Sequence, residues 1–176
     1  VGVGAEGVHD AADEAGLEVL LAAATTAGAV VQEYVRGKLV TFDGLTDREG
    51  RVVFAASATY AAGVMELSKG GLDVVYHVRR EIPPEVRRVG ERVLAAFDVR
   101  GRFFHIEMFE LPDGSVRPLE INMRPPGGFS VDLMNFAGDV DLYRAWAAVV
   151  TGHRPPALPS ELRYATAHVG RRRWHR

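Results

Sequence analysis

The sequence predicts an α+β fold, in which an antiparallel sheet is flanked by helices. Short apolar runs are joined by turn sequences such as TDREG and PDG, which favour hairpins. Helical segments that open with proline or aspartate are interleaved with these hairpins. A doubly wound parallel sheet would need strand and helix to alternate throughout, so the order of elements favours α+β.

The first expected elements are a helix and a strand. Asp10 is a candidate cap for a helix that begins at Ala11, carries leucines on one stripe and stops at Gly28. Residues 29–35, AVVQEYV, are expected to form the strand that follows. The sequence RGK then leads into a second extended run.

Hairpins and single strands are interleaved with helices in the rest of the chain. Residues 39–45 and 51–57 are expected to pair as a hairpin around the turn TDREG. Pro83 and Pro84 start a helix over 85–97, because proline is favoured in the first helical turn. The other expected elements are a strand over 72–80, the hairpin described next, two helices over 130–150 that divide near Gly138 with Asp139 capping the second, and a last strand over 161–169.

A second hairpin carries a glutamate on each of its strands. Asp-Gly at 113–114 between apolar runs predicts a two-residue turn. In the register that this turn sets, Glu107 lies opposite Glu120 and His105 lies opposite Asn122. Side chains alternate between the two faces of a strand, so all four belong to one face.

Two glutamates that face each other need a partner. At an effective dielectric of about 20 they repel by roughly 3 kcal/mol, a large part of a domain's stability. A protonated carboxylate, an arginine between them or a divalent cation would each offset this repulsion. Two carboxylates with the amide oxygen of Asn122 are hard ligands that suit magnesium. A solvated hairpin face is the alternative.

The composition is that of an ordinary globular protein of 176 residues, 47% hydrophobic and 25% charged. A formal net charge of −2 gives no sign of nucleic-acid or anionic-membrane binding. No run approaches the roughly 20 apolar residues of a membrane span. The absence of cysteine excludes disulfides and thiolate chemistry. We therefore expect a cytoplasmic protein with no nucleic-acid or membrane partner.

The remaining motifs are less specific. Gly2, Gly4 and Gly7 match the pattern GxGxxG, and a helix and a strand containing Glu33 follow them, as in a dinucleotide-binding fold. A loop whose backbone amides approach phosphates is the broader inference, and a plain turn is the alternative. The six histidines lack the spacing of a metal motif, so each is expected to lie on the surface or in the core.

Together these parts resemble the C-terminal two-thirds of an ATP-grasp domain. The resemblance rests on the glycine-rich loop, on the strand QEYV followed by a glycine, on Glu107, and on the motif EIN-x-R-x-x-GG that begins at Glu120. It covers residues 2–152, and EIN-x-R-x-x-GG is its most specific part. It implies an ATP-grasp fold, an antiparallel sheet with flanking helices, whose N-terminal portion is missing from this sequence.

The sequence is also expected to be part of a longer protein, because it begins within a glycine-rich loop and ends in RRRWHR without a stop signal. By the resemblance, residues 1–35 are the remainder of the small ATP-grasp lobe and contain the glycine-rich loop. Residues 36–157 are the large lobe with the metal site. Residues 158–176 are a C-terminal strand and a basic tail.

The resemblance assigns a metal and catalytic set to the second hairpin. Glu107, Glu120 and Asn122 would bind two magnesium or manganese ions that hold the ATP phosphates. Arg124 would steady the transferring phosphoryl group and the acyl-phosphate that forms. Phosphoryl transfer depends mostly on positioning and charge neutralisation, which these side chains can provide.

The resemblance also assigns nucleotide contacts. The strand over 32–35 would contact adenine, and the N-terminal glycine-rich loop would close over the phosphates. Leu39 stands where family members usually carry an acidic residue for ribose, so Asp43 is expected to take that part. The implied nucleotide-binding residues are Gly2, Gly4, Gln32, Glu33, Tyr34, Val35 and Asp43.

The implied function is that of an ATP-dependent ligase that activates a carboxylate as an acyl-phosphate for attack by an amine or thiol. The spacing around TFDGL and PPGGFS resembles the carbamoyl-phosphate-synthase-like branch. The implied partners are a small carboxylate and an amine, and a homodimer is left open. Two alternatives remain, an NAD(P)-binding Rossmann-type oxidoreductase and a non-catalytic ATP-binding module.

Overall fold

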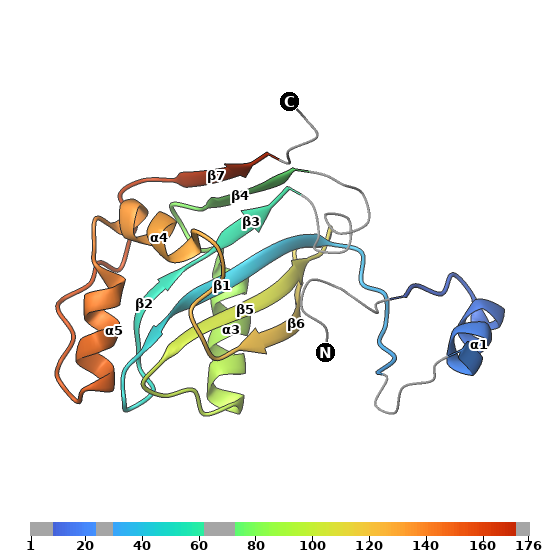
Figure 1. Ribbon diagram of the computed structural model, residues 1–176, viewed down its shortest axis with the longest axis horizontal. Helices are drawn as coiled ribbons and strands as arrows, with labels where there is room; N and C mark the ends of the chain where they lie inside the picture. Colours follow the sequence, from blue (N-terminus) through green and yellow to red (C-terminus); the bar gives the residue numbers. More distant parts are fainter. Residues whose placement is uncertain (1–8, 24–29, 62–72, 172–176) are drawn as a thin grey trace.

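The computed structural model describes residues 9–23, 30–61 and 73–171 (Figure 1). These residues form one antiparallel sheet with helices on both faces, which confirms the α+β prediction. The elements are α1 (Glu14–Ala23), β1 (Lys38–Thr46), β2 (Val52–Ala56), β3 (Ala58–Tyr60), β4 (Val74–Val78), α3 (Pro84–Ala96), β5 (Phe103–Glu110), β6 (Val116–Asn122), α4 (Ser130–Gly138), α5 (Leu142–Val150) and β7 (Thr166–Gly170).

The sheet has the strand order β6-β5-β1-β3-β4-β7, and β2 pairs with β1 beyond the end of β3. Every pairing among the described strands is antiparallel. A dinucleotide-binding Rossmann fold needs a parallel sheet, so the described part of the chain does not have that alternative fold. The residues of the GxGxxG match lie outside the described ranges.

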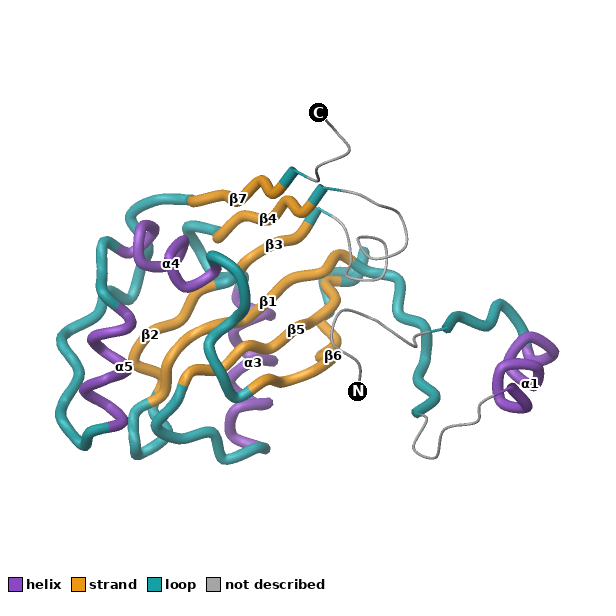
Figure 2. Tube along the Cα trace, viewed as in Figure 1, coloured by secondary structure: helices purple, strands orange, loops and turns teal. Residues whose placement is uncertain are grey.

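Different helices cover the two faces of the sheet (Figure 2). Val40 and Phe42 of β1 point toward α3, whereas Leu45 points toward α4 and α5. The packing against α3 is close, because a Cβ on Gly90 would lie only 2.2 Å from the ring of Phe42. No described helix is long and apolar enough to cross a membrane.

The helix boundaries differ from the predicted ones at their caps. α1 begins at Glu14, and the Asp13 carboxylate accepts a hydrogen bond from the Gly16 amide at 2.8 Å, so the cap is Asp13 and not Asp10. α5 is capped by Asp141, whose side chain accepts from the Arg144 amide. In each case another aspartate lies two or three residues away, and the sequence alone does not choose between them.

Two strand predictions also need correction. Residues 30–35 form no strand and are mostly exposed, because an apolar run forms a strand only where it finds a partner. The run predicted as one strand over 51–57 is followed by a further strand, β3, which begins after Ser57 and pairs with β1 and β4. The last strand begins at Thr166, five residues later than predicted, and extends the same sheet through β4.

The β5–β6 hairpin has the predicted facing pairs but not the predicted turn. The loop contains three residues, 112–114, of which only Gly114 has positive φ, at 82°. Such a loop shifts the pairing by one residue, so Phe109 lies opposite Arg117. A bulge at Leu119 then restores the register, so Glu107 lies opposite Glu120 as predicted.

Candidate functional site

A group of polar side chains lies on the sheet face opposite α3. Thr41 and Asp43 of β1 alternate with the buried Val40 and Phe42, so they point to the other face. β5 lies beside β1 in antiparallel register, which places His105 opposite Asp43 and Glu107 opposite Thr41. The two central strands therefore bring four polar side chains together beneath the surface.

These side chains form a continuous hydrogen-bonded chain. The Thr41 hydroxyl donates to Asp43, whose other oxygen accepts from His105 Nδ1 at 2.6 Å. His105 Nε2 donates to Glu107 Oε1 at 3.2 Å. The side chains of Asp43, His105 and Glu107 are only 5%, 7% and 17% exposed, so water screens these contacts weakly.

Within this hydrogen-bonded chain of side chains, His105 is the group that carries a positive charge. Burial alone would lower its pKa, but the charge of Asp43 and the hydrogen bonds to Asp43 and Glu107 raise the pKa to about 10. At neutral pH the ring is therefore an imidazolium and can donate from both nitrogens. The sequence predicts only a surface or core role for His105, although a histidine inside the apolar run FFHIEMF marks a buried polar residue.

The predicted metal ligands gather at the end of the hairpin, where β6 is the edge strand. Glu107 and Glu120 are directly opposed, and Asn122 Nδ2 donates to Glu120 Oε1 at 2.7 Å. In the described part of the chain no hydrogen bond or ion pair engages the remaining oxygens, Glu107 Oε2, Glu120 Oε2 and Asn122 Oδ1. One oxygen of each predicted ligand is thus free for a hard cation.

This donor set fits a divalent metal by its chemistry. Magnesium uses one or two carboxylates and completes its shell with water and phosphate oxygens. Among the described residues, no three His, Cys, Asp or Glu side chains form a ready-made metal cluster. The fit therefore rests on two carboxylates and one amide oxygen, as predicted from the sequence.

Arg124 follows the hairpin in an exposed loop and donates to the carbonyl of Pro125 at 2.9 Å. The loop leads over the sheet face to α4 (Figure 2). A Cβ on Gly128 would lie 3.6 Å from the Tyr76 hydroxyl. Burial, followed by the charge of Asp43, raises the pKa of the neighbouring Tyr60 far above its usual value, so Tyr60 stays neutral. These contacts bring the loop and two tyrosines to the edge of the polar chain.

Asp43, the residue predicted to contact ribose, is buried within this hydrogen-bonded chain. Its side chain is 5% exposed, and its two oxygens are engaged by Thr41 and His105. In this arrangement its carboxylate anchors the histidine, and the contact with ribose stays a prediction.

The predicted adenine segment runs along the hairpin side of the sheet before β1. Gln32, Glu33 and Tyr34 are exposed and Val35 is half-buried. Glu33 Oε2 accepts from Arg117 Nη1 of β6 at 2.8 Å, which places this segment beside the edge strand. Gly2 and Gly4 lie outside the described residues, so their predicted roles are untested.

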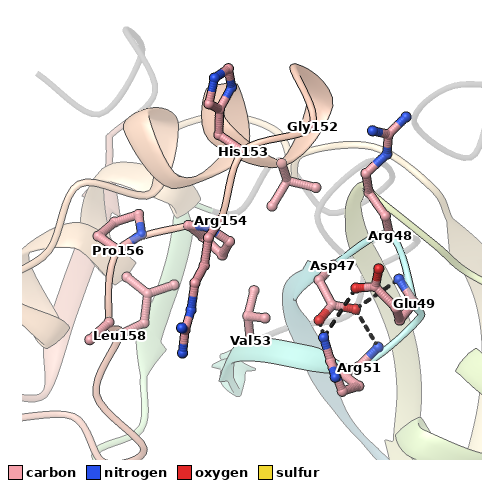
Figure 3. A pocket seen from close by; sticks show the side chains of 13 residues that line it. Asp47, Arg48, Glu49, Arg51, Val53, Gly152, His153, Arg154, Pro156 and Leu158 are labelled. Atoms are coloured by element: carbon pink, nitrogen blue, oxygen red, sulfur yellow. Dashed lines mark hydrogen bonds and ion pairs between the residues drawn. The ribbon is translucent and has the colours of Figure 1, made fainter.

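A cavity of about 850 Å³ lies elsewhere, between the β1–β2 turn and the end of α5 (Figure 3). Asp47 and Glu49 on one wall are paired with Arg51, and Arg154 and Leu158 line the other wall. None of the predicted site residues lines this cavity. It is therefore separate from the polar chain on the sheet face.

No protein-family model and no curated protein matches the chain. Similar proteins are found only by comparison of structures. One similar structure is the ATPase subunit of phosphoribosylaminoimidazole carboxylase from Aquifex aeolicus, at 20% identity and a TM-score of 0.59 over 78% of this chain and 41% of that one. Another is phosphoribosylglycinamide synthetase from Anaerococcus prevotii, at 13% identity and a TM-score of 0.63 over 77% and 35%.

A third similar structure is biotin carboxylase from Campylobacter jejuni, at 11% identity and a TM-score of 0.59 over 77% of this chain and 30% of that one. The chain thus spans less than half the length of these structures. All three are ATP-grasp enzymes. The described part of this chain therefore has the ATP-grasp fold that its sequence motifs resemble.

Proposed function

We propose that this chain is the nucleotide- and metal-binding part of an ATP-dependent ligase. The reaction class is activation of a carboxylate as an acyl-phosphate, followed by attack of an amine or thiol. The single observation that carries the proposal is the set of free oxygens on Glu107, Glu120 and Asn122, gathered at the end of one hairpin in an ATP-grasp fold. The similarity to phosphoribosylglycinamide synthetase and biotin carboxylase is compatible with the carbamoyl-phosphate-synthase-like branch.

The free oxygens would hold magnesium or manganese. When bound, the metal neutralises charge on the phosphate oxygens of ATP. Arg124 is exposed two residues beyond the hairpin, and its guanidinium can reach outward to steady the transferring phosphoryl group. The loop after Arg124 would exclude water from the acyl-phosphate, which would otherwise hydrolyse.

The segment before β1 would hold the nucleoside. Residues 32–35 belong to no strand, so their backbone groups can form hydrogen bonds with adenine. The salt bridge between Glu33 and Arg117 links this segment to β6, the strand that also carries Glu120 and Asn122. Gly2 and Gly4 would contribute backbone amides to the phosphates, and Asp43 or a residue beyond this site would contact ribose.

Formation of ADP in the full-length protein tests the proposal. We expect ADP to form only with ATP, a divalent metal and a carboxylate together. Glu107→Gln should lower this rate at least about 100-fold, because even partners of metal ligands cost 10- to 100-fold when lost. Glu110→Gln is the matched control, since Glu110 lies on the same strand and pairs with Arg79 on the face toward α3.

Three results separate the hypotheses. Equal rates in Glu107→Gln and Glu110→Gln would contradict the assignment of the metal site. Magnesium-dependent ATP binding without ADP formation, over a broad panel of carboxylates and amines, would favour the non-catalytic ATP-binding module. Loss of ADP formation in Arg124→Ala with magnesium-ATP binding intact would place Arg124 in the chemical step.

A further inference from the structure

The buried chain that ends at Glu107 is more elaborate than the fold requires. It begins at the Ala58 amide of β3, which donates to the Thr41 hydroxyl at 3.1 Å, and it continues through Asp43 and His105. Burying two carboxylates and a histidine ring between central strands is costly, and apolar residues would fill the same space at a lower cost in free energy. A role beyond stability would account for this arrangement.

The hydrogen-bonded chain ends at one oxygen of the proposed metal site, Glu107 Oε1. His105 Nε2 donates to Glu107 Oε1 and leaves Oε2 free. The opposite nitrogen of the ring is fixed by Asp43 at 2.6 Å, so the imidazole cannot turn without breaking this contact. The buried residues Asp43 and His105 thereby fix the orientation of the Glu107 carboxylate from the interior of the protein.

We propose that His105, anchored by Asp43, is a positioning residue that holds the Glu107 carboxylate with its free oxygen directed at the bound cation. This inference rests on the proposed function, because it assumes that Glu107 is a metal ligand. Groups that hydrogen-bond to metal ligands fix the ligand geometry, and their loss commonly weakens metal binding about 10- to 100-fold. Asp43 acts on the Glu107 carboxylate only through His105 and would not contact the cation itself.

Two amide substitutions separate the two ends of the histidine. The amide nitrogen of Asn lies near the position of Nδ1, and that of Gln lies near the position of Nε2. His105→Asn therefore keeps a donor for Asp43 and loses the donor for Glu107, whereas His105→Gln does the reverse. Glu110→Gln again serves as the control, because it removes a 2.9 Å ion pair with Arg79 on the opposite face of the same sheet.

The measurement is metal affinity in the full-length protein, by calorimetric titration of magnesium or manganese into the complex with a non-hydrolysable ATP analogue. His105→Asn should bind the metal about 10- to 100-fold more weakly. His105→Gln keeps the donor for Glu107 but loses the anchor to Asp43, so its metal affinity should lie between those of wild type and His105→Asn. The metal affinity of Glu110→Gln should match that of wild type. Affinity for the analogue without metal should be the same in all four proteins, which distinguishes positioning from general loss of structure.

The wild-type protein provides a second readout that needs no variant to fold. In proteins with ¹⁵N-labelled histidine, adding magnesium to the analogue complex should shift the Nε2–H resonance of His105 and leave the Nδ1–H resonance nearly unchanged. No shift of either resonance, in a protein that binds magnesium-ATP, would overturn the positioning role.

The remaining outcomes are equally decisive. Wild-type affinity in His105→Asn, or equal losses in His105→Asn and Glu110→Gln, would overturn the inference and leave the proposed function standing. Wild-type protein that binds ATP without any dependence on metal would overturn the proposed function and this inference together.

Discussion

The two strands of the β5–β6 hairpin carry facing glutamates in opposite surroundings. Glu107 is 17% exposed and accepts a hydrogen bond from a histidine that Asp43 anchors. Glu120 lies on the edge strand, is exposed and contacts only Asn122 among the described residues. The proposed metal site would therefore combine a carboxylate whose orientation is fixed with one that is free to adjust.

This comparison also explains why the facing charges are tolerated. The sequence leaves three answers open, and the structure adds a fourth, because the charge of His105 offsets that of Glu107 before any cation binds. No arginine pairs with either glutamate within the described ranges. The same two carboxylates should therefore respond differently to mutation, and the following predictions test this difference from the largest effect to the smallest.

The largest effect is expected from removing the central histidine. His105→Ala leaves the carboxylates of Asp43 and Glu107 without a cation, and breaking a buried pair from one side typically costs about 3–5 kcal/mol. We expect the free energy of unfolding to fall by that amount at pH 7. Urea denaturation measures this change in the free energy of unfolding. A loss below about 1 kcal/mol would mean that the hydrogen bonds among Asp43, His105 and Glu107 do not stabilise the fold.

A change of pH should remove part of the same stability without mutation. The pKa of His105 is raised from 6.5 to about 10, so between these values the folded protein binds more protons than the unfolded chain. The contribution is complete below about pH 6.5 and is lost as pH rises through about 10. The free energy of unfolding of wild type should therefore be lower at pH 10 than at pH 7, and the difference should be smaller in His105→Gln. An equal difference in wild type and His105→Gln would assign the decrease to other groups.

The two glutamates should differ in their effect on the metal-free protein. Glu107→Gln replaces a charged acceptor of the His105 hydrogen bond and should lower the free energy of unfolding by about 1–3 kcal/mol. Glu120→Gln relieves repulsion at an exposed edge and should leave stability unchanged or raise it by up to about 1 kcal/mol. Thermal melts of both variants without metal test this difference in stability. A similar loss of stability in both variants would contradict the prediction.

The smallest effect concerns the turn that joins the two strands. Gly114 has φ of 82° with no atom near its Cβ position, so Gly114→Ala adds backbone strain alone. We expect a loss of about 1 kcal/mol. Gly127→Ala is the matched control, because Gly127 has equally open surroundings and no positive φ. Equal melting temperatures of the two variants would argue against the three-residue loop.

The sequence predicts much of this hairpin, and the reasons are instructive. Alternation and the Asp-Gly signal locate both strands, because hydrophobic period and turn chemistry are local properties. The facing of Glu107 and Glu120 is also correct, but only because the three-residue loop and the bulge at Leu119 shift the register in opposite directions. Bulges depend on packing and twist, so the sequence alone does not reveal this one.

The contact between His105 and Asp43 is not predicted from the sequence, because it depends on tertiary structure. His105 and Asp43 are 62 positions apart and meet only because β1 pairs with β5. No local pattern encodes that pairing, so His105 is predicted as an ordinary core or surface histidine, and Asp43 is assigned to ribose by resemblance. The proposed metal ligands are easier to identify from the sequence, because they lie on one hairpin and mostly within one specific motif.

The most direct test of the proposed site is the stabilisation of the full-length protein by magnesium-ATP. Wild type, Glu107→Gln, Glu120→Gln and the double variant are melted with and without magnesium-ATP. We expect a shift in wild type, little or no shift in either single variant, and no further loss in the double variant, because the two ligands act as one unit. Full wild-type shifts in both single variants would show that these carboxylates bind no metal and would contradict the proposed function.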